Sequence, residues 1–146
     1  MGDNPEVIYW DASAVLSTLF RDAHSDTALR WVQMEGFHLL SSLAHAEVSA
    51  VIARMKKESI LSDALVDMSF EALSQGPWRR LRSHPDWSGT EELARKWSLR
   101  GADLWHLSAA RSLKEELPEL VLLTFDARLG LAVQGEGLAP GEKEGG

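Results

Sequence analysis

The feature that most constrains the fold is a short apolar run near the N-terminus, residues 7–10 (VIYW), which leads directly into Asp11. All four residues have high β-propensity, and polar residues precede them, which is typical of a strand buried on both faces of a parallel sheet. Ligands of open parallel sheets bind beyond the carboxyl ends of the strands. The sequence therefore predicts that Asp11 lies at a binding edge.

Further along the chain, strand-like and helix-like segments alternate. Apolar runs at 37–41 and 121–125 predict two more strands, and the alternating segment 78–82 predicts an edge strand whose arginines reach solvent. Apolar residues at helical spacing predict helices at 12–20, 25–34, 43–57, 62–73, 88–99, 104–117 and 127–133. Parallel strands require such crossovers, so we expect a three-layer α/β/α sandwich around a mostly parallel sheet of four or five strands.

Local signals suggest helix ends and a domain boundary. Ser88 and Glu91 have the spacing of a capping box, and Gly36 is placed to end the second helix. With 146 residues, the chain is long enough for one domain with a conventional core. We assign that domain to residues 1–138 and expect the Gly- and Glu-rich residues 139–146 to form a mobile tail.

Composition excludes several kinds of chemistry. The chain has no cysteine, which excludes disulfides, thiolate metal sites and a cysteine nucleophile. Its formal net charge of −7 argues against binding nucleic acid through bulk charge, but it allows a local basic groove or an acidic pocket that holds divalent cations. No signal-peptide pattern and no apolar run of membrane-spanning length occur, so we expect a cytoplasmic protein with no membrane partner.

Three aspartates stand at the starts of predicted helices. Asp11 and Asp126 directly follow the two clearest predicted strands, and Asp103 begins the helix after residues 101–102. Aspartate is a favoured N-cap worth about 1 kcal/mol, so capping alone explains each position. Taken singly, each aspartate is as compatible with a helix cap as with a ligand.

Glu47 favours the ligand interpretation. On the predicted helix 43–57 its same-face neighbours are Leu43, Ala50 and Val51, so a carboxylate lies on an apolar stripe. Carboxylates are rarely buried unless they are paired or bind a metal. The alternative is that Glu47 lies at the edge of the stripe or pairs with an arginine.

These four carboxylates would repel one another if they met at one sheet edge. Two charges 4 Å apart cost about 4 kcal/mol at an effective dielectric constant of 20, so such a cluster takes up protons or binds a cation. An all-oxygen set, with no cysteine and no histidine pair at ligand spacing, suits Mg²⁺ or Mn²⁺ better than zinc. Carboxylate-held Mg²⁺ serves phosphoryl and phosphodiester transfer by polarising phosphate oxygens and activating water.

Four segments occur in the order and approximate spacing found in PIN-domain ribonucleases. They are residues 8–14 (IYWDASA), 46–48 (AEV), 100–109 (RGADLWHLSA) and 123–126 (LTFD). Any one motif is weak, whereas the ordered set is fairly specific. Over about residues 7–138 the sequence resembles this family, and within it the VapC-type toxins of bacterial toxin–antitoxin pairs.

The resemblance implies an RNA endonuclease that depends on Mg²⁺ or Mn²⁺. The residues that match the family's catalytic, metal-binding quartet are Asp11, Glu47, Asp103 and Asp126. The resemblance also implies that the hydroxyl groups of Ser13 and Thr124 bond the acids or the substrate. It implies a homodimer, and inhibition by a small antitoxin protein whose C-terminal segment fills the groove beside the acids. Trp105 departs from the family pattern, in which a smaller residue is common.

Other residues have structural explanations as well as functional ones. The arginines of 79–82 and the basic residues of 54–57 offer local RNA contacts, although the second group ends a helix, where cations commonly balance the dipole. His106 has apolar neighbours and fits a packed or capping residue, so we leave it outside the catalytic set. For Trp78 and Trp87, core packing is favoured over base stacking.

Three alternatives remain open, and one of them treats all four acids as helix caps and surface charges of a stable domain without an assigned role. A phosphatase of the haloacid-dehalogenase type also begins with a strand followed by aspartate, but it needs a second aspartate two residues on, where this chain has Ser13. A non-catalytic PIN-fold interaction domain would instead bind a peptide in a tryptophan-bearing groove. Binding of a divalent cation distinguishes the nuclease from the interaction domain.

Overall fold

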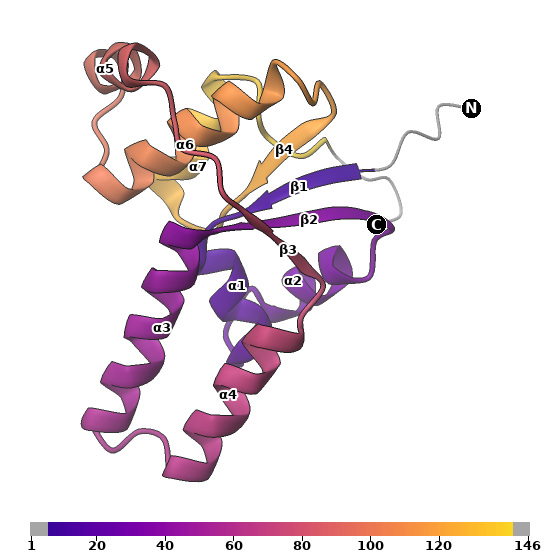
Figure 1. Cartoon of the computed structure of the whole chain (residues 1–146), viewed down its shortest axis with the longest axis vertical. Coiled ribbons are helices and arrows are strands. Elements are labelled where there is room, and N and C mark those ends of the chain that lie inside the picture. Colours follow the sequence, from indigo (N-terminus) through magenta and orange to yellow (C-terminus); the bar gives the residue numbers. More distant parts are fainter. Residues whose placement is uncertain (1–5, 142–146) are drawn as a thin grey trace.

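The structure is a computed structural model that describes residues 6–141. Figure 1 shows a central sheet with helices on both of its faces. The strands are β1 (Glu6–Trp10), β2 (Gly36–Ser41), β3 (Trp78–Leu81) and β4 (Leu120–Leu123). The helices are α1 (Ala12–Leu19), α2 (Ser25–Val32), α3 (Ser42–Lys57), α4 (Asp63–Gln75), α5 (Trp87–Lys96), α6 (Gly101–Lys114) and α7 (Ala127–Gly135).

Within residues 6–141 the sheet has four strands in the order β3-β2-β1-β4, and every neighbouring pair is parallel. The predicted α/β/α sandwich and its parallel sheet are therefore confirmed. The alternating segment near residue 80 forms the edge strand β3, as predicted. Because all the strands run the same way, their carboxyl ends lie along one edge, where the chain passes from strand to helix.

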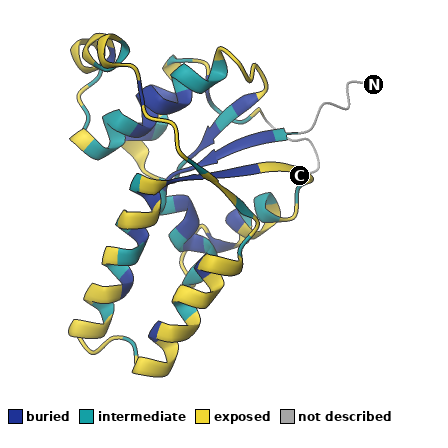
Figure 2. Ribbon diagram, viewed as in Figure 1, coloured by how far each residue is buried: buried dark blue, intermediate teal, exposed yellow. Residues whose placement is uncertain are grey.

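Strand β1 is central and separates two apolar layers. Val7 and Tyr9 belong to the layer packed against α5, α6 and α7, whereas Ile8 and Trp10 belong to the layer packed against α1 to α4. Figure 2 shows β1 as buried along nearly all of its length. Burial on both faces explains why this run is uniformly apolar rather than alternating.

The N-cap of helix α5 lies two residues earlier than predicted, at Asp86 rather than Ser88. The Asp86 carboxylate accepts hydrogen bonds from the Gly89 N–H at 3.0 Å and from the Ser88 hydroxyl at 2.7 Å. The predicted capping box at Ser88 is therefore wrong. The helix also ends at Lys96 instead of continuing to residue 99.

Replacing Asp86 with alanine is expected to lower the melting temperature by about 2–4 °C, because a helix in a chain of this size loses its cap. Ser88→Ala removes only one donor to the same carboxylate, so we expect a smaller change. Differential scanning calorimetry of the two variants makes the comparison. A larger loss for Ser88→Ala would restore the capping box.

Gly36 does not end a helix, contrary to the prediction. Helix α2 ends at Val32, and Gly36 opens β2 with a φ of +147°. A Cβ atom at this position would lie 2.3 Å from the Glu6 carbonyl oxygen on the neighbouring strand. The glycine therefore allows the close approach of β1 and β2.

Residues beyond α7 extend the core on the β4 side of the sheet. Leu138 is fully buried, and its carbonyl oxygen accepts a hydrogen bond from the Leu122 N–H at 2.9 Å. Of the predicted tail, residues 142–146 lie outside the described part of the chain, as do residues 1–5. Between residues 6 and 141, no helix has both the length and the apolar character needed to cross a membrane.

Candidate active site

A cavity of about 510 Å³ opens at the carboxyl ends of β1 and β4, between α1, α3 and α6. The structure brings all four predicted acids into its lining, although they come from distant parts of the sequence. Each of them follows a strand or lies in the first two turns of a helix, and they are Asp11, Glu47, Asp103 and Asp126. This arrangement follows from the parallel sheet, which turns every strand end toward the same edge.

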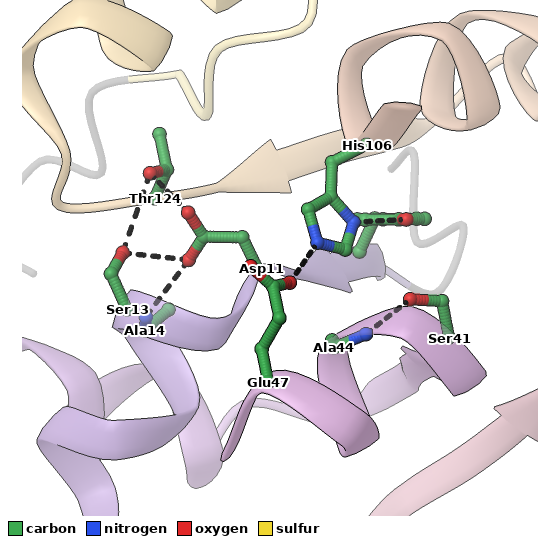
Figure 3. Close-up of polar contacts among 9 residues, drawn as sticks. Asp11, Ser13, Ala14, Ser41, Ala44, Glu47, His106 and Thr124 are labelled. Atoms are coloured by element: carbon green, nitrogen blue, oxygen red, sulfur yellow. Dashed lines mark hydrogen bonds and ion pairs between the residues drawn. The ribbon is translucent and has the colours of Figure 1, made fainter. Parts of the chain in front are cut away.

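Asp11 is a helix cap and a member of the cavity at the same time. Its Oδ1 accepts hydrogen bonds from the Ala14 N–H at 2.9 Å and from the Ser13 hydroxyl at 2.7 Å, and its Oδ2 accepts one from Thr124 (Figure 3). The Ser13 oxygen also accepts from the Phe125 N–H at 3.0 Å, which links the end of β1 to the end of β4. Burial raises the pKa of Asp11 despite these bonds.

The other two aspartates differ in their local roles. Asp126 caps α7 by accepting a hydrogen bond from the Leu129 N–H at 2.9 Å, and its side chain is exposed. Asp103 lies in the first turn of α6, whose N-cap is Arg100 without a side-chain bond. The prediction that Asp103 begins the helix, and its capping explanation, are therefore wrong, since α6 starts at Gly101.

Asp103 shows the electrostatic strain of this cluster. Its pKa is raised first by partial burial, and then by the negative charges of Asp126 and Glu47. Repulsion between carboxylates favours the protonated form of one of them, or a bound cation that neutralises them. The cavity thus has the charge imbalance that the sequence predicted for this edge.

Glu47 lies at the edge of the buried stripe of α3, which is formed by Ala44, Val48 and Ile52. Its side chain is 31% exposed and bonds a histidine rather than an arginine: the His106 Nε2 and the Glu47 Oε1 are 2.7 Å apart. The alternative that placed Glu47 at the stripe's edge is therefore correct about its position. Glu47 still reaches the cavity, because the edge of the stripe faces α6 (Figure 3).

His106 is the residue that the sequence interpretation left out. It is buried, and its Nδ1 lies 2.7 Å from the Tyr9 hydroxyl. Burial raises the pKa of Tyr9, so the phenol keeps its proton. The Glu47 carboxylate can only accept a hydrogen bond, so Nε2 carries a proton and donates it, and in the neutral imidazole Nδ1 then accepts from the Tyr9 hydroxyl. The available signal was the position of His106 one helical turn after Asp103.

Two arginines also line the cavity. Arg54 comes from the last turns of α3 and Arg100 from the N-cap of α6. The sequence interpretation placed the basic end of this helix in solvent, which fits Lys56, whose ammonium group lies 3.5 Å from the exposed Asp63. Arg54 is exposed as well, but it also lines the cavity and adds positive charge beside the acids, where an anionic substrate could be held.

The chemistry of the donor set fits a hard divalent cation, since four carboxylates supply only oxygen ligands. Between residues 6 and 141, however, no three acidic or histidine side chains lie close enough together to form a metal site as they stand. Both oxygens of Asp11 and one of Glu47 already accept hydrogen bonds.

Comparison with known proteins gives one family and several similar folds. The model of the PIN domain family matches residues 8–132, a range that contains all four acids. A search of curated protein sequences finds no match.

Three crystal structures with similar folds share less than a fifth of their residues with this chain. PAE2754 from Pyrobaculum aerophilum is 18% identical with a TM-score of 0.59, and the match covers 89% of this chain and 81% of that one. VapC20 from Mycobacterium tuberculosis, described as a sarcin-ricin loop cleaving toxin, is 16% identical with a TM-score of 0.59 and coverage of 86% and 94%. FitAcB from Neisseria gonorrhoeae is 15% identical with a TM-score of 0.58 and coverage of 88% and 94%. At these identities the likeness establishes a common fold.

Proposed function

The chain belongs to the PIN-domain family, and from this membership we propose that it is a Mg²⁺- or Mn²⁺-dependent endoribonuclease that hydrolyses RNA phosphodiester bonds. The observation that carries the proposal is the meeting of four carboxylates from distant segments in one cavity at the carboxyl edge of the sheet. Helix capping accounts for Asp11 and Asp126, but it leaves Asp103 and Glu47 unexplained. A shared cation would account for all four.

In this proposal the acids bind the metal and the surrounding residues hold them in place. A bound Mg²⁺ or Mn²⁺ would polarise phosphate oxygens and lower the pKa of a coordinated water. Ser13 and Thr124 fix the orientation of the Asp11 carboxylate through their hydroxyl groups. His106 does the same for Glu47 by donating its Nε2 proton.

The arginines of the cavity have a separate task. Arg54 and Arg100 stand beside the acids with guanidinium groups that suit phosphate oxygens. They would bind the backbone of RNA in a protein whose net charge of −7 otherwise repels it. Positioning the phosphate beside the acids is a large part of what such a site contributes to catalysis.

The proposal extends to biological context: a cytoplasmic toxin of a toxin–antitoxin pair, which forms a homodimer and is inhibited by a small antitoxin protein. The fold shared with VapC20, described as a toxin, supports this context. So do three large apolar side chains at the far end of the α3–α4 hairpin, Ile60, Leu65 and Met68, which are 60%, 47% and 62% exposed. Exposed apolar side chains on one hairpin commonly mark a protein interface.

Metal dependence is the direct test of this proposal. We expect isothermal titration calorimetry to show saturable Mn²⁺ binding, and cleavage of single-stranded RNA to stop in excess EDTA and return when Mg²⁺ is added. Bound metal at a hundredfold excess over Kd should also raise the free energy of unfolding by about 2.7 kcal/mol.

Three outcomes would contradict the proposal. Cleavage that persists in EDTA would remove the metal from the mechanism. A protein that binds no Mn²⁺ and cuts no RNA would favour the interaction domain, and release of phosphate from a small phosphomonoester would favour the phosphatase.

A further inference from the structure

A second cavity, of about 280 Å³, lies where the edge strand β3 ends beside the first turn of α3. Its lining includes Ser42 and His45 from α3, and Arg80 and Arg82 from β3 and the following residue. Arg79 faces away and lies over the Phe37 ring, 4.5 Å from its centroid. Among residues 6–141, Arg80 and Arg82 form no ion pair, so both guanidinium groups are available to a ligand.

A third cavity, of about 560 Å³, follows directly along the chain. It is lined by His84, Pro85 and Trp87, by Thr90 and Glu91 of α5, and by Trp105 of α6. Trp87 is 85% exposed, so the prediction that it packs in the core is wrong, whereas Trp78 does pack against Trp10 with ring centroids 5.7 Å apart. A large aromatic ring exposed beside a second tryptophan offers a stacking surface.

Each of these two cavities has one helix in common with the acid-lined cavity. Helix α3 presents Ser42 and His45 to the basic cavity and Glu47, half a turn later, to the acids. On α6, the Trp105 ring meets the His106 ring edge-on at 5.7 Å, and His106 bonds Glu47. Helix α3 therefore lines both the basic and the acid-lined cavity, and helix α6 lines both the aromatic and the acid-lined cavity.

We propose that the basic and aromatic cavities together bind a nucleotide of single-stranded RNA next to the bond that is cut. Arg80 and Arg82 hold a phosphate, and Trp87 with Trp105 stacks on a base. Cationic and aromatic surfaces joined along residues 80–87 match the alternation of phosphate and base in a single strand. This inference rests on the proposed nuclease function, since it assigns a subsite for the same substrate.

RNA is favoured over a peptide as the occupant because of charge. The chain carries a net charge of −7, yet this surface concentrates arginines that have no acidic partner within the described residues. A single RNA strand offers phosphates to the arginines of the basic cavity and bases to the tryptophans of the aromatic cavity. An apolar peptide would complement only the aromatic one.

Binding of RNA without cleavage tests the subsite. The probe is a fluorescein-labelled oligouridylate of about ten nucleotides, and its anisotropy is followed in EDTA at several salt concentrations. Arg80→Gln with Arg82→Gln should weaken binding and reduce the slope of log K against log salt by about 0.7, the value for one lost single-strand phosphate contact. The charge-matched control, Arg21→Gln with Arg30→Gln on the α2 side, should leave the slope near that of the unaltered protein.

The aromatic cavity is tested with the same probe. Trp87→Ala should weaken binding by roughly 5- to 150-fold, the usual effect of losing one stacked base. Trp87→Phe keeps an aromatic face and should retain most of the affinity. An oligonucleotide of abasic sugar-phosphate should bind the unaltered protein and the Trp87→Ala variant equally.

The outcomes separate this subsite from the nuclease proposal. If the unaltered protein cleaves RNA in a metal-dependent way and neither variant changes affinity, the subsite is overturned and the nuclease stands. If the variants lose affinity as expected but no condition supports cleavage, the subsite stands and the nuclease fails. A Trp87→Ala variant that loses only self-association in light scattering overturns the subsite in favour of a protein interface.

Discussion

Replacing Asp103 with asparagine is expected to abolish RNA cleavage while raising the melting temperature of the metal-free protein. The loss of activity follows because Asp103 is a proposed metal ligand that no helix cap or hydrogen bond accounts for. We expect more than about a hundredfold loss, beyond the 10- to 100-fold typical when an outer partner of a metal ligand is removed. Single-turnover cleavage of a labelled RNA measures it.

The gain in stability follows from the direction of the pKa shift. The folded-state pKa of Asp103 lies above its ordinary value, because of partial burial and the charges of Asp126 and Glu47. The folded protein therefore binds more protons than the unfolded chain between these two values, and stability falls as the pH rises through that window. At neutral pH the penalty is fully present, and asparagine removes it.

The matched control is Asp67→Asn, an exposed carboxylate of α4 outside the acid-lined cavity. It should change neither cleavage nor melting temperature appreciably. The stability gain of Asp103→Asn should disappear below the ordinary carboxyl pKa, and saturating Mn²⁺ should reverse it, because only the unaltered site binds the ion fully. An active Asp103→Asn enzyme would remove this residue from the site.

Asp11→Asn should also abolish cleavage, but it changes the free energy of unfolding in two opposing ways. The Asp11 carboxylate accepts three hydrogen bonds and caps α1, so the substitution changes more than one charge. Asn can still accept at the cap, but its amide nitrogen cannot accept from Thr124. Removal of the buried charge raises the free energy of unfolding, whereas the loss of these hydrogen bonds lowers it.

The sequence allowed prediction of the sheet and of the acids because both depend on a simple topological rule. The run at 7–10 is apolar throughout, which identifies a two-sided buried strand and hence a parallel sheet. In such a sheet, residues that follow different strands meet at one edge whatever their separation in sequence. That rule brings Asp126 beside Asp11, even though the strand before it ends at Leu123 rather than 125.

Features set by side-chain geometry could not be predicted in the same way. The cap of α5 depends on which of several nearby oxygens reaches Gly89, and Asp86 rather than Ser88 does so. With the cap at Asp86 instead of Ser88, Trp87 becomes the first residue of the helix, and a different set of side chains faces solvent. Helical periodicity in the sequence does not indicate which residue caps the helix or which side chain faces solvent, because contacts between elements decide both.

His106 shows how burial can conceal a contact with the proposed site. Apolar neighbours predict that it packs in the core, and it is indeed only 1% exposed. Both ring nitrogens of a buried imidazole need hydrogen-bond partners, however. Here Nδ1 bonds the Tyr9 hydroxyl and Nε2 bonds the Glu47 carboxylate at the cavity. The same burial that suggests a structural role therefore fixes the orientation of a proposed metal ligand.

This double role can be separated by two substitutions of similar size. His106→Gln places an amide donor near the former Nε2 and should still bond Glu47, whereas His106→Asn places an amide near the former Nδ1 and should still bond Tyr9. We expect His106→Asn to lose about 10- to 100-fold in cleavage and in Mn²⁺ affinity, as when the outer partner of a metal ligand is removed. His106→Gln should retain much more of both.

Stability should follow the opposite order. His106→Gln leaves the buried Tyr9 hydroxyl without its acceptor, which costs about 1–3 kcal/mol, and Tyr9→Phe added to it should recover part of that loss. Urea unfolding of the three variants measures these differences beside the cleavage rates. If activity instead falls in proportion to stability across the series, His106 only supports the fold, and the orientation of Glu47 does not depend on it.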